Sequence, residues 1–247
     1  SPYGAIVTTI KNMVNIDTVY QRVLAIANKE QRGYITPQEF NLFANQAQVE
    51  IFEQYFYDEN QFGRIAGNST EYSDMLDLLK EKIALFKVSE ELPVSQILTG
   101  GGTASMPIGM YRLGDIYIDN YKLERVEENE LSVIQNSIIT PSIKRPVYTA
   151  NDDRFVFYSG SSMIINSQFD VKITYVRMPN AVNWSYSVID EHALYDPTYA
   201  LDFELHNSEE TSLVMKILSL AGITLKDNTL YQAGQTSEVK KIQQEKQ

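Results

Sequence analysis

Residues 28–57 read NKEQRGYITPQEFNLFANQAQVEIFEQYFY, and this stretch predicts a sharp turn between two helices. Gly33 suits the left-handed backbone conformation that ends a helix. Thr36 is expected to cap the next helix, with Pro37 at its first position and Glu39 completing a capping box. Behind this start, apolar residues recur at spacings of three and four and predict one buried helical face: Phe40, Phe43, Ala44, Ala47, Ile51 and Tyr55.

The same stretch partly matches the ligand spacing of an EF-hand calcium loop, which would begin at Asn28 and end at Glu39. Arg32 places a cation where the loop needs an oxygen ligand. Pro37 and the capping box account for the same residues without a metal ion. We therefore interpret this stretch as a corner between helices and expect no calcium site.

The composition is that of a folded, acidic protein. Of the 247 residues, 43% are hydrophobic and 21% are charged, and the formal net charge is −11. These fractions exclude a disordered chain, and the length allows one larger domain or two smaller ones. The charge is spread along the chain without a basic patch, which argues against tight nucleic-acid binding.

The sequence has no cysteine, which excludes disulfides, thiolate catalysis and cysteine-based zinc sites. No apolar run has the length of a membrane span, and the first residues do not resemble a signal peptide. We therefore expect no membrane contact and assembly in a reducing cytosol. The 16 tyrosines suit surfaces that are buried against a partner yet remain partly wet.

The pattern of hydrophobic residues predicts an α+β fold with an N-terminal helical bundle, a central antiparallel β-rich region and C-terminal helices. The expected parts are an arm at residues 1–12, the bundle at 13–88, the β-rich region at 89–189, and helices at 190–247 that pack on the bundle and end in a polar tail. Helical spacing predicts three helices in the bundle: Ile16–Ala27, Pro37–Tyr57 and Glu71–Phe86.

In the central region, apolar and polar residues alternate over six short stretches, which predicts strands separated by turns. Residues 100–102, three consecutive glycines, are expected to form a mobile loop without the lysine of a phosphate-binding loop. Trp184 is expected to pack over the end of the sheet.

At the C-terminal end, Ser208 is predicted to cap a helix that stops at Gly222. A last helix is expected to end in a polar tail at residues 236–247, where Val239 and Ile242 are the apolar residues. Two apolar side chains bury too little surface to order a helix alone, so both are candidate contacts with a neighbouring protein.

No catalytic or cofactor-binding motif is present, and we assign no catalytic, cofactor-binding or metal-binding residue. Both histidines, His192 and His206, lie in residues 190–210, which also hold seven acidic side chains and no Lys or Arg. These groups are possible ligands for a hard divalent metal, so a metal-dependent hydrolase is the alternative from another functional class. The spacing matches no metalloprotease or phosphatase motif, and a helix start accounts for Glu209 and Glu210.

Four segments carry a resemblance to a known group: NIDTVYQRVLAIANKEQRGYITPQEFNLFANQAQVEIFEQYF, RPVYTANDDRFVFY, VKITYVRMPNAVNW and FELHNSEETSLVMKILSLAGI. Together they extend over most of the chain, and they resemble virion structural proteins of short-tailed and crAss-like bacteriophages. Within that group, helices at both ends of a β-rich middle are similar to head–tail connector or adaptor proteins.

The resemblance implies a non-enzymatic subunit of a homo-oligomeric ring of about twelve copies at the virion neck, assembled in the host cytoplasm. Such a ring bridges the portal protein and the adjacent neck or tail proteins, and DNA passes through its channel without specific binding. An acidic lumen suits this role because like charges keep DNA from adhering. The alternatives within the same class are a tail hub, a capsid-vertex protein and a cargo protein.

Overall fold

The computed structural model describes residues 13–29, 35–64, 70–92, 95–98, 101–118, 120–138, 140–142, 144–158 and 171–222. The predictions for the arm at residues 1–12, for Gly33, and for Val239 and Ile242 lie outside these residues. The chain divides into two compact units. One, the helical unit, holds the residues up to Leu85 and those from Pro179 onwards, and the other, the β unit, holds residues 86–178. Helices and mostly antiparallel strands together confirm the α+β class.

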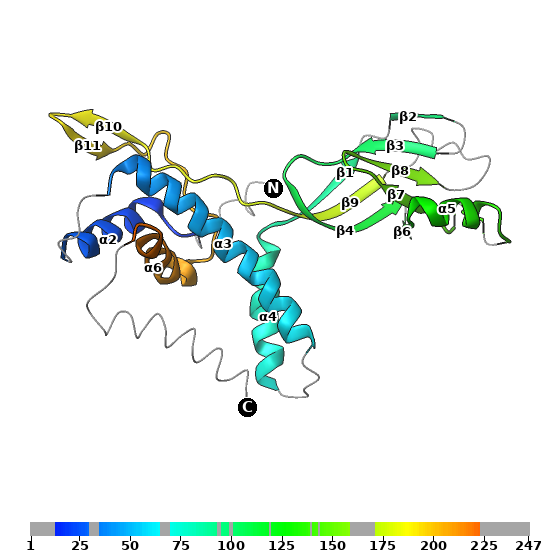
Figure 1. Ribbon diagram of the computed structural model, residues 1–247, viewed down its shortest axis with the longest axis horizontal. Coiled ribbons are helices and arrows are strands. Elements are labelled where there is room, and N and C mark those ends of the chain that lie inside the picture. The colour runs from blue at the N-terminus through cyan, green and yellow to red at the C-terminus, as the bar shows by residue number, and fades with distance from the viewer. Residues whose placement is uncertain are drawn as a thin grey trace, which may run out of the picture. The chain divides into compact units, whose positions relative to one another are not determined.

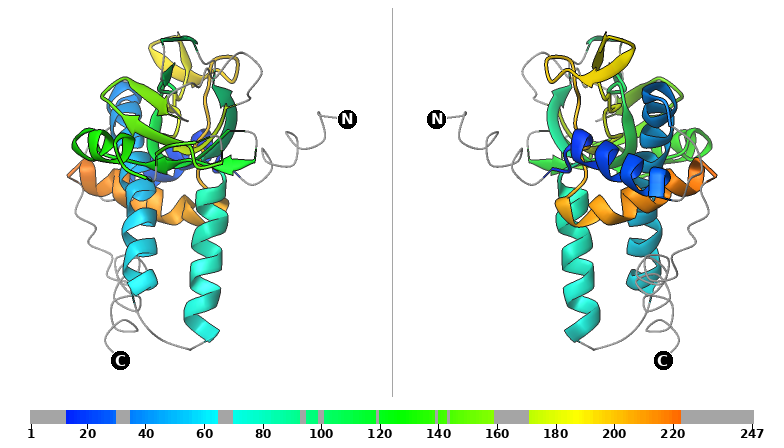
Figure 2. Two further views of the ribbon diagram at one scale, coloured as in Figure 1. Left: turned by 90° about the vertical axis from the view of Figure 1, so that its right-hand side faces the viewer. Right: turned by 90° about the vertical axis from the view of Figure 1, so that its left-hand side faces the viewer.

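The helical unit is built from helices around one long central helix, with a separate β-hairpin (Figure 1). Its elements are α2 (Ile16–Lys29), α3 (Pro37–Arg64), α4 (Thr70–Ala84), β10 (Tyr186–Ile189), β11 (His192–Tyr195), the 3-10 helix η1 (Asn207–Glu209) and α6 (Glu210–Leu220). α3 packs against α4 and α6, and α2 packs against α6 (Figure 2). The buried face of α2 is the one that the sequence predicts: Ile16, Val19, Tyr20, Val23 and Ala27.

Local capping signals fix where α2 and α3 begin. The Thr36 backbone N–H donates to Glu39 Oε2 at 3.0 Å, and the Glu39 backbone N–H donates to Thr36 Oγ1 at 3.3 Å. The capping box is therefore confirmed, with Pro37 as the first residue of α3. In α2 the cap is Asn15, whose Oδ1 accepts from the Thr18 backbone N–H at 3.0 Å.

Two expectations for these helices are wrong. α3 does not end near Tyr57 but continues to Arg64. Polar residues that form pairs four apart support this extra length, as in the 2.7 Å hydrogen bond from Gln54 to Asp58. Leu78 is expected in the buried stripe of α4, but it is exposed. The side of α4 that faces the core is the one that carries Leu79 and Ile83, which are buried.

The β unit consists of two sheets that share one hydrophobic core. In the first sheet the order is β1 (Lys87–Leu92), β9 (Val171–Arg177), β4 (Met110–Ile118) and β5 (Tyr121–Lys122). In the second it is β2 (Ser95–Leu98), β3 (Gly101–Ser105), β8 (Arg154–Tyr158), β7 (Val147–Ala150) and β6 (Glu124–Arg125). The short helix α5 (Glu128–Gln135) follows β6. Neighbouring strands are antiparallel, except that β6 and β7 run parallel.

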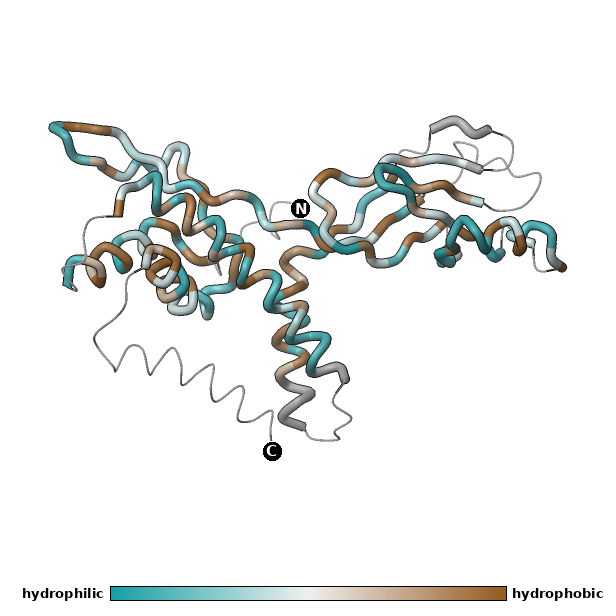
Figure 3. The backbone as a smooth tube through the Cα atoms, viewed as in Figure 1, coloured by the Kyte–Doolittle hydropathy of each residue, from teal (hydrophilic) through white to brown (hydrophobic). Residues whose placement is uncertain are grey.

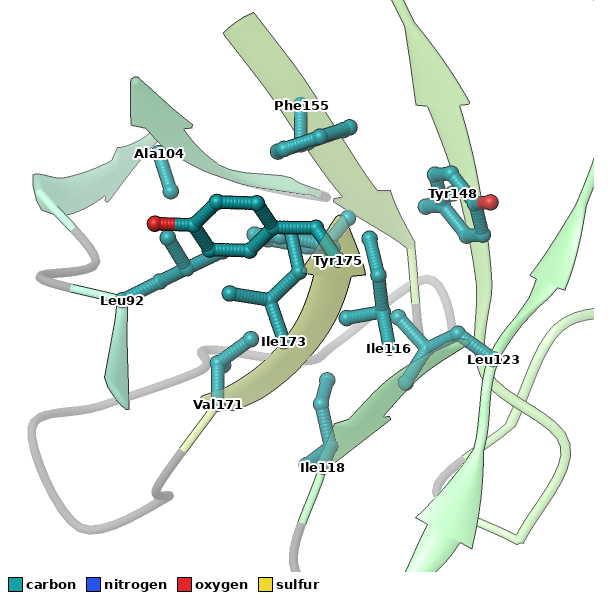
Figure 4. Packing of buried hydrophobic residues seen from close by; sticks show 11 residues of the cluster. Leu92, Ala104, Ile116, Ile118, Leu123, Tyr148, Phe155, Val171, Ile173 and Tyr175 are labelled. Carbon is teal, nitrogen blue, oxygen red and sulfur yellow. The ribbon is translucent and has the colours of Figure 1, made fainter. Parts of the chain in front are cut away.

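Figure 4 shows the core between these sheets, where alternate residues of β4, β8 and β9 point inward. Aliphatic side chains of β4 and β9 face the aromatic rings of Phe155 and Phe157 on β8. The expectation of a mobile loop at residues 100–102 is wrong for Gly101 and Gly102, which lie in β3. There Gly102 pairs with Phe157 of β8. Glycine by itself does not favour a strand, so pairing with the neighbouring strand holds these residues extended.

Candidate functional site

Three amide side chains on α3 bind the main chain of an extended segment, residues 180–184. The first two, Asn41 and Asn45, are four residues apart and therefore lie on one side of the helix. Asn41 Oδ1 accepts from the Trp184 backbone N–H at 2.7 Å, and Asn41 Nδ2 donates to the Trp184 carbonyl oxygen at 3.2 Å. Asn45 makes the same pair of bonds with Val182, at 2.9 and 3.0 Å.

Gln48 is the third of these amides and is itself buried. Its Nε2 donates to the Asn180 carbonyl oxygen at 2.8 Å, and its Oε1 accepts from the Glu204 backbone N–H at 3.0 Å. The segment is thus bound at every second residue, as a strand is bound by its neighbour, with helix side chains in place of that neighbour. We call Asn41, Asn45 and Gln48 the amide ladder.

The amide ladder corrects the expected domain boundary. Residues 179–189 belong to the helical unit, whereas the sequence predicts that the β-rich region extends to residue 189 and that residues 178–184 close its sheet. The amides occur in the sequence at positions 41, 45 and 48, beside the apolar stripe of the same helix. Such a row of amides is the signal that could have identified a main-chain partner for α3.

Trp184 lies in the helical unit, so the expectation that it covers the end of the sheet is wrong. It is 2% exposed, and its Nε1 donates to Asp17 Oδ1 at 2.9 Å. Its ring centroid lies 4.1 Å from that of Tyr20 and 5.8 Å from those of Tyr186 and Tyr195. A buried indole needs an acceptor for its N–H, and the first turn of α2 provides one. Trp184 therefore joins α2 to the base of the hairpin.

Beyond this base, β10 and β11 extend away from the helices (Figure 1). Ile189 pairs with His192, which leaves Asp190 and Glu191 as a two-residue turn with φ of +49° and +65°. Positive φ at both positions is the geometry that hairpin turns of this length require, although glycine or asparagine is more usual there. The sequence contains no such residue at the turn, which explains why the hairpin was not predicted.

Hydrophobic and hydrophilic residues lie next to one another at the end of the hairpin (Figure 3). In the single chain, Val188 is 66% exposed, Ile189 is 54% exposed and Leu194 is 48% exposed. We call these three residues, with Asp190 and Glu191, the hairpin surface. An apolar surface on a braced projection is typical of a protein contact site.

The acidic segment at residues 190–210 makes structural contacts. Five of its seven carboxylates bind groups in the helical unit: Asp196 with Thr198, Asp202 with Ile16, Glu204 with Asn180, Glu209 with Lys82 and Glu210 with Arg22. The two histidines lie apart in the fold, His192 on β11 and His206 before η1. Within the described parts of the chain, no three His, Cys, Asp or Glu side chains are grouped to hold a metal ion.

The cap of the C-terminal helix differs from the prediction. Ser208 lies inside η1, and His206 is the cap of η1, since its Nδ1 accepts from the Ser208 backbone N–H at 3.3 Å. The N-cap of α6 is Glu209, which makes no side-chain cap hydrogen bond. An acceptor nitrogen on an extended residue replaces the expected hydroxyl. The stop at Gly222 is confirmed, since α6 ends at Leu220 and Gly222 has a φ of +71°.

Lys82 and Glu209 form a largely buried ion pair between α4 and η1. The Lys82 Nζ also lies 5.5 Å from the centroid of the Tyr55 ring. Burial, and next the nearby Glu209 carboxylate, raise the pKa of the Tyr55 phenol well above its usual value. The phenol therefore stays protonated and acts as a packing group, not as a base.

A shallow hollow of about 620 Å³ in the β unit is lined by Glu127, Glu128, Asn129, Ala150, Asn151 and Asp152. Its lining provides carboxylates and amides. Arg125 pairs with Glu127 at 3.4 Å.

The β unit also exposes apolar side chains on loops. Ile108 and Ile138 are fully exposed, and Val133 on α5 is largely exposed. Ile108 lies at the tip of a turn in which Gly109 has a φ of +79° and the Met110 N–H donates to the Pro107 carbonyl oxygen at 3.3 Å. These side chains form a second set of candidate contacts.

No protein-family model and no curated protein sequence matches the chain. No helix in the described ranges is long and apolar enough to cross a membrane. Exposed apolar side chains are found both at the hairpin surface and, in the β unit, at Ile108 and Ile138. Both have the chemistry of protein contacts.

Proposed function

We propose that the protein is a non-enzymatic virion structural protein, a subunit of a head–tail connector or adaptor ring that bridges portal and tail around a DNA channel. The observation that carries the proposal is the hairpin surface. Its apolar side chains lie on a projection that Trp184 and the amide ladder brace at its base. Such an arrangement suits a subunit whose projection is covered by a neighbour in an assembly.

The charge of the chain supports the same proposal. A net charge of −11 disfavours contacts with DNA phosphates, which suits a channel through which DNA moves without being held. The resemblance to connector proteins of short-tailed and crAss-like bacteriophages adds the location, at the neck of the virion. Portal protein on one side and tail proteins on the other are the proposed partners.

The test is the number of copies and their symmetry. Electron microscopy of the purified full chain, alone and mixed with the portal protein of the same virion, is expected to show a ring of about twelve subunits. A chain that stays monomeric in both samples would refute the proposal. A copy number in the virion that does not match the portal would favour a tail hub, capsid-vertex or cargo protein.

The hydrolase alternative has a separate test. It requires a divalent metal that stays bound through purification and is lost when His192→Ala and His206→Ala are introduced. Metal analysis of the parent and of both variants decides it. Absence of bound metal, together with unchanged assembly of both variants, would exclude the hydrolase.

A further inference from the structure

We infer that the hairpin surface of one subunit binds residues 5–11 of a second copy of the chain, which add to the hairpin as a β-strand. The inference rests on the proposed ring for its purpose, because the contact would join neighbouring subunits. Its chemistry comes from three observations: a strand edge, exposed apolar side chains beside that edge, and a segment of the chain that complements both.

The first observation is the free edge of β10. Among the described strands, β10 and β11 pair only with each other. The Asp196 N–H donates to the Ser185 carbonyl oxygen at 2.9 Å, which makes these two residues a hydrogen-bonded pair. Hydrogen-bonded pairs alternate along an antiparallel ladder, so the main-chain N–H and C=O of Val188 point outward. An outward-facing edge of this kind accepts an extended peptide.

The second observation concerns the side chains beside that edge. Ile189 and Leu194 lie on one face of the hairpin and Val188 on the other, because side chains alternate along a strand. An added strand would place its own alternate side chains next to both faces. All three side chains are exposed, so they are available to a strand added at this edge.

The third observation is that the chain itself contains a complementary segment. Residues 5–11 read AIVTTIK, in which β-branched residues predominate, and these favour strands. Lys11 is the one charged side chain before Asp17, and a segment added parallel to β10 would bring it next to the acidic turn at Asp190 and Glu191. A strand of seven residues is about 23 Å long, longer than the four residues of β10 need.

The position of the segment restricts which neighbour it reaches. Asn12 alone separates Lys11 from Met13, and Met13 is fixed by a bridge to His206 in the helical unit. Two residues of extended chain span about 7 Å. The hairpin that binds the segment must therefore belong to a subunit directly beside the first, as in a ring with head-to-tail contacts.

The chain has no cysteine, so disulfide cross-linking tests this contact without background. A Thr8→Cys chain carrying a size tag is mixed with an untagged Ser187→Cys chain and oxidised mildly. Ser187 is exposed on β10. We expect a mixed disulfide dimer at least about tenfold more abundant than with the control partner, Ser212→Cys, which is exposed on α6. Equal yields with both partners would overturn the inference.

A chain with both Thr8→Cys and Ser187→Cys identifies the source of the segment. If it closes its disulfide within one molecule at high dilution, the hairpin binds the chain's own segment, and the second copy is excluded. Charge reversal gives an independent measure: Lys11→Glu and Glu191→Lys should each weaken self-association about two- to fivefold, and the double variant should restore it. Weakening without restoration counts against the pairing.

The outcomes separate this inference from the proposed function. A ring that assembles on the portal without the mixed disulfide would leave the connector proposal standing and refute the strand contact. The mixed disulfide in a chain that never binds the portal would confirm the strand contact and refute the connector proposal.

Discussion

The substitution Asn45→Ala tests whether the amide ladder holds residues 180–184 on α3. It removes the two hydrogen bonds to Val182, at 2.9 and 3.0 Å. Val182 is 3% exposed, so its N–H and C=O would be left without partners away from water. Each unpaired buried group costs about 1–3 kcal/mol, and the better helix propensity of alanine returns about 0.5 kcal/mol. Because the segment can move towards water, we expect a loss of about 2–4 kcal/mol in unfolding free energy.

The single tryptophan makes the measurement local. Trp184 lies in the segment that the ladder binds, so its fluorescence during urea denaturation reports on the helical unit. The matched control is Gln46→Ala on the exposed side of α3, where the side chain bonds only to Glu50. We expect the control to change the stability by about 0.5 kcal/mol or less. Equal unfolding free energies for the Asn45→Ala and Gln46→Ala variants would refute the role of the ladder.

Three further predictions concern other parts of the chain. Gly114→Ala should destabilise the β unit by about 1–3 kcal/mol in urea denaturation followed by circular dichroism, whereas Ser89→Ala should not; the new Cβ would lie 2.7 Å from the Thr174 carbonyl oxygen. Hydrogen bonds from the cap of α3 lower the pKa of Glu39, so its stabilising effect is present above about pH 4.5 and lost as pH falls through its folded pKa. The stability difference between parent and Glu39→Gln should therefore shrink in acid, and a constant difference would contradict the assignment. Deleting residues 236–247 should leave the circular dichroism of the core unchanged but weaken assembly with the neighbouring virion protein, and full assembly would show that this tail has no partner.

The sequence by itself determined those features that depend on contacts within one turn of chain. The capping box at Thr36 and Glu39, the start of α2 after Asn15, and the stop at Gly222 follow from side chains that bind main-chain groups a few residues away. Spacing alone also identified the buried face of α2, because a regular helix repeats every 3.6 residues. The alternation in β8 and β9 predicted strands for the same reason.

The exposed hairpin was decided only by the tertiary structure. Residues 185–196 lack a clear alternation of apolar and polar residues, and their turn lacks the residues that usually mark a hairpin. Whether Val188 and Ile189 point into a core or into solvent depends on what the rest of the chain places beside them. Sequence spacing carries no information about that neighbour.

The assignment of residues 179–189 to the helical unit also came from the tertiary structure. Trp184 and Asp17 are far apart in the sequence, yet one hydrogen bond of 2.9 Å joins them. The main chain of residues 180–184 needs partners wherever it is buried, and a strand or a row of amides satisfies that need equally well. The local backbone preference of residues 180–184 does not distinguish a neighbouring strand from a row of amides. Long-range packing on α3 decides between these two partners.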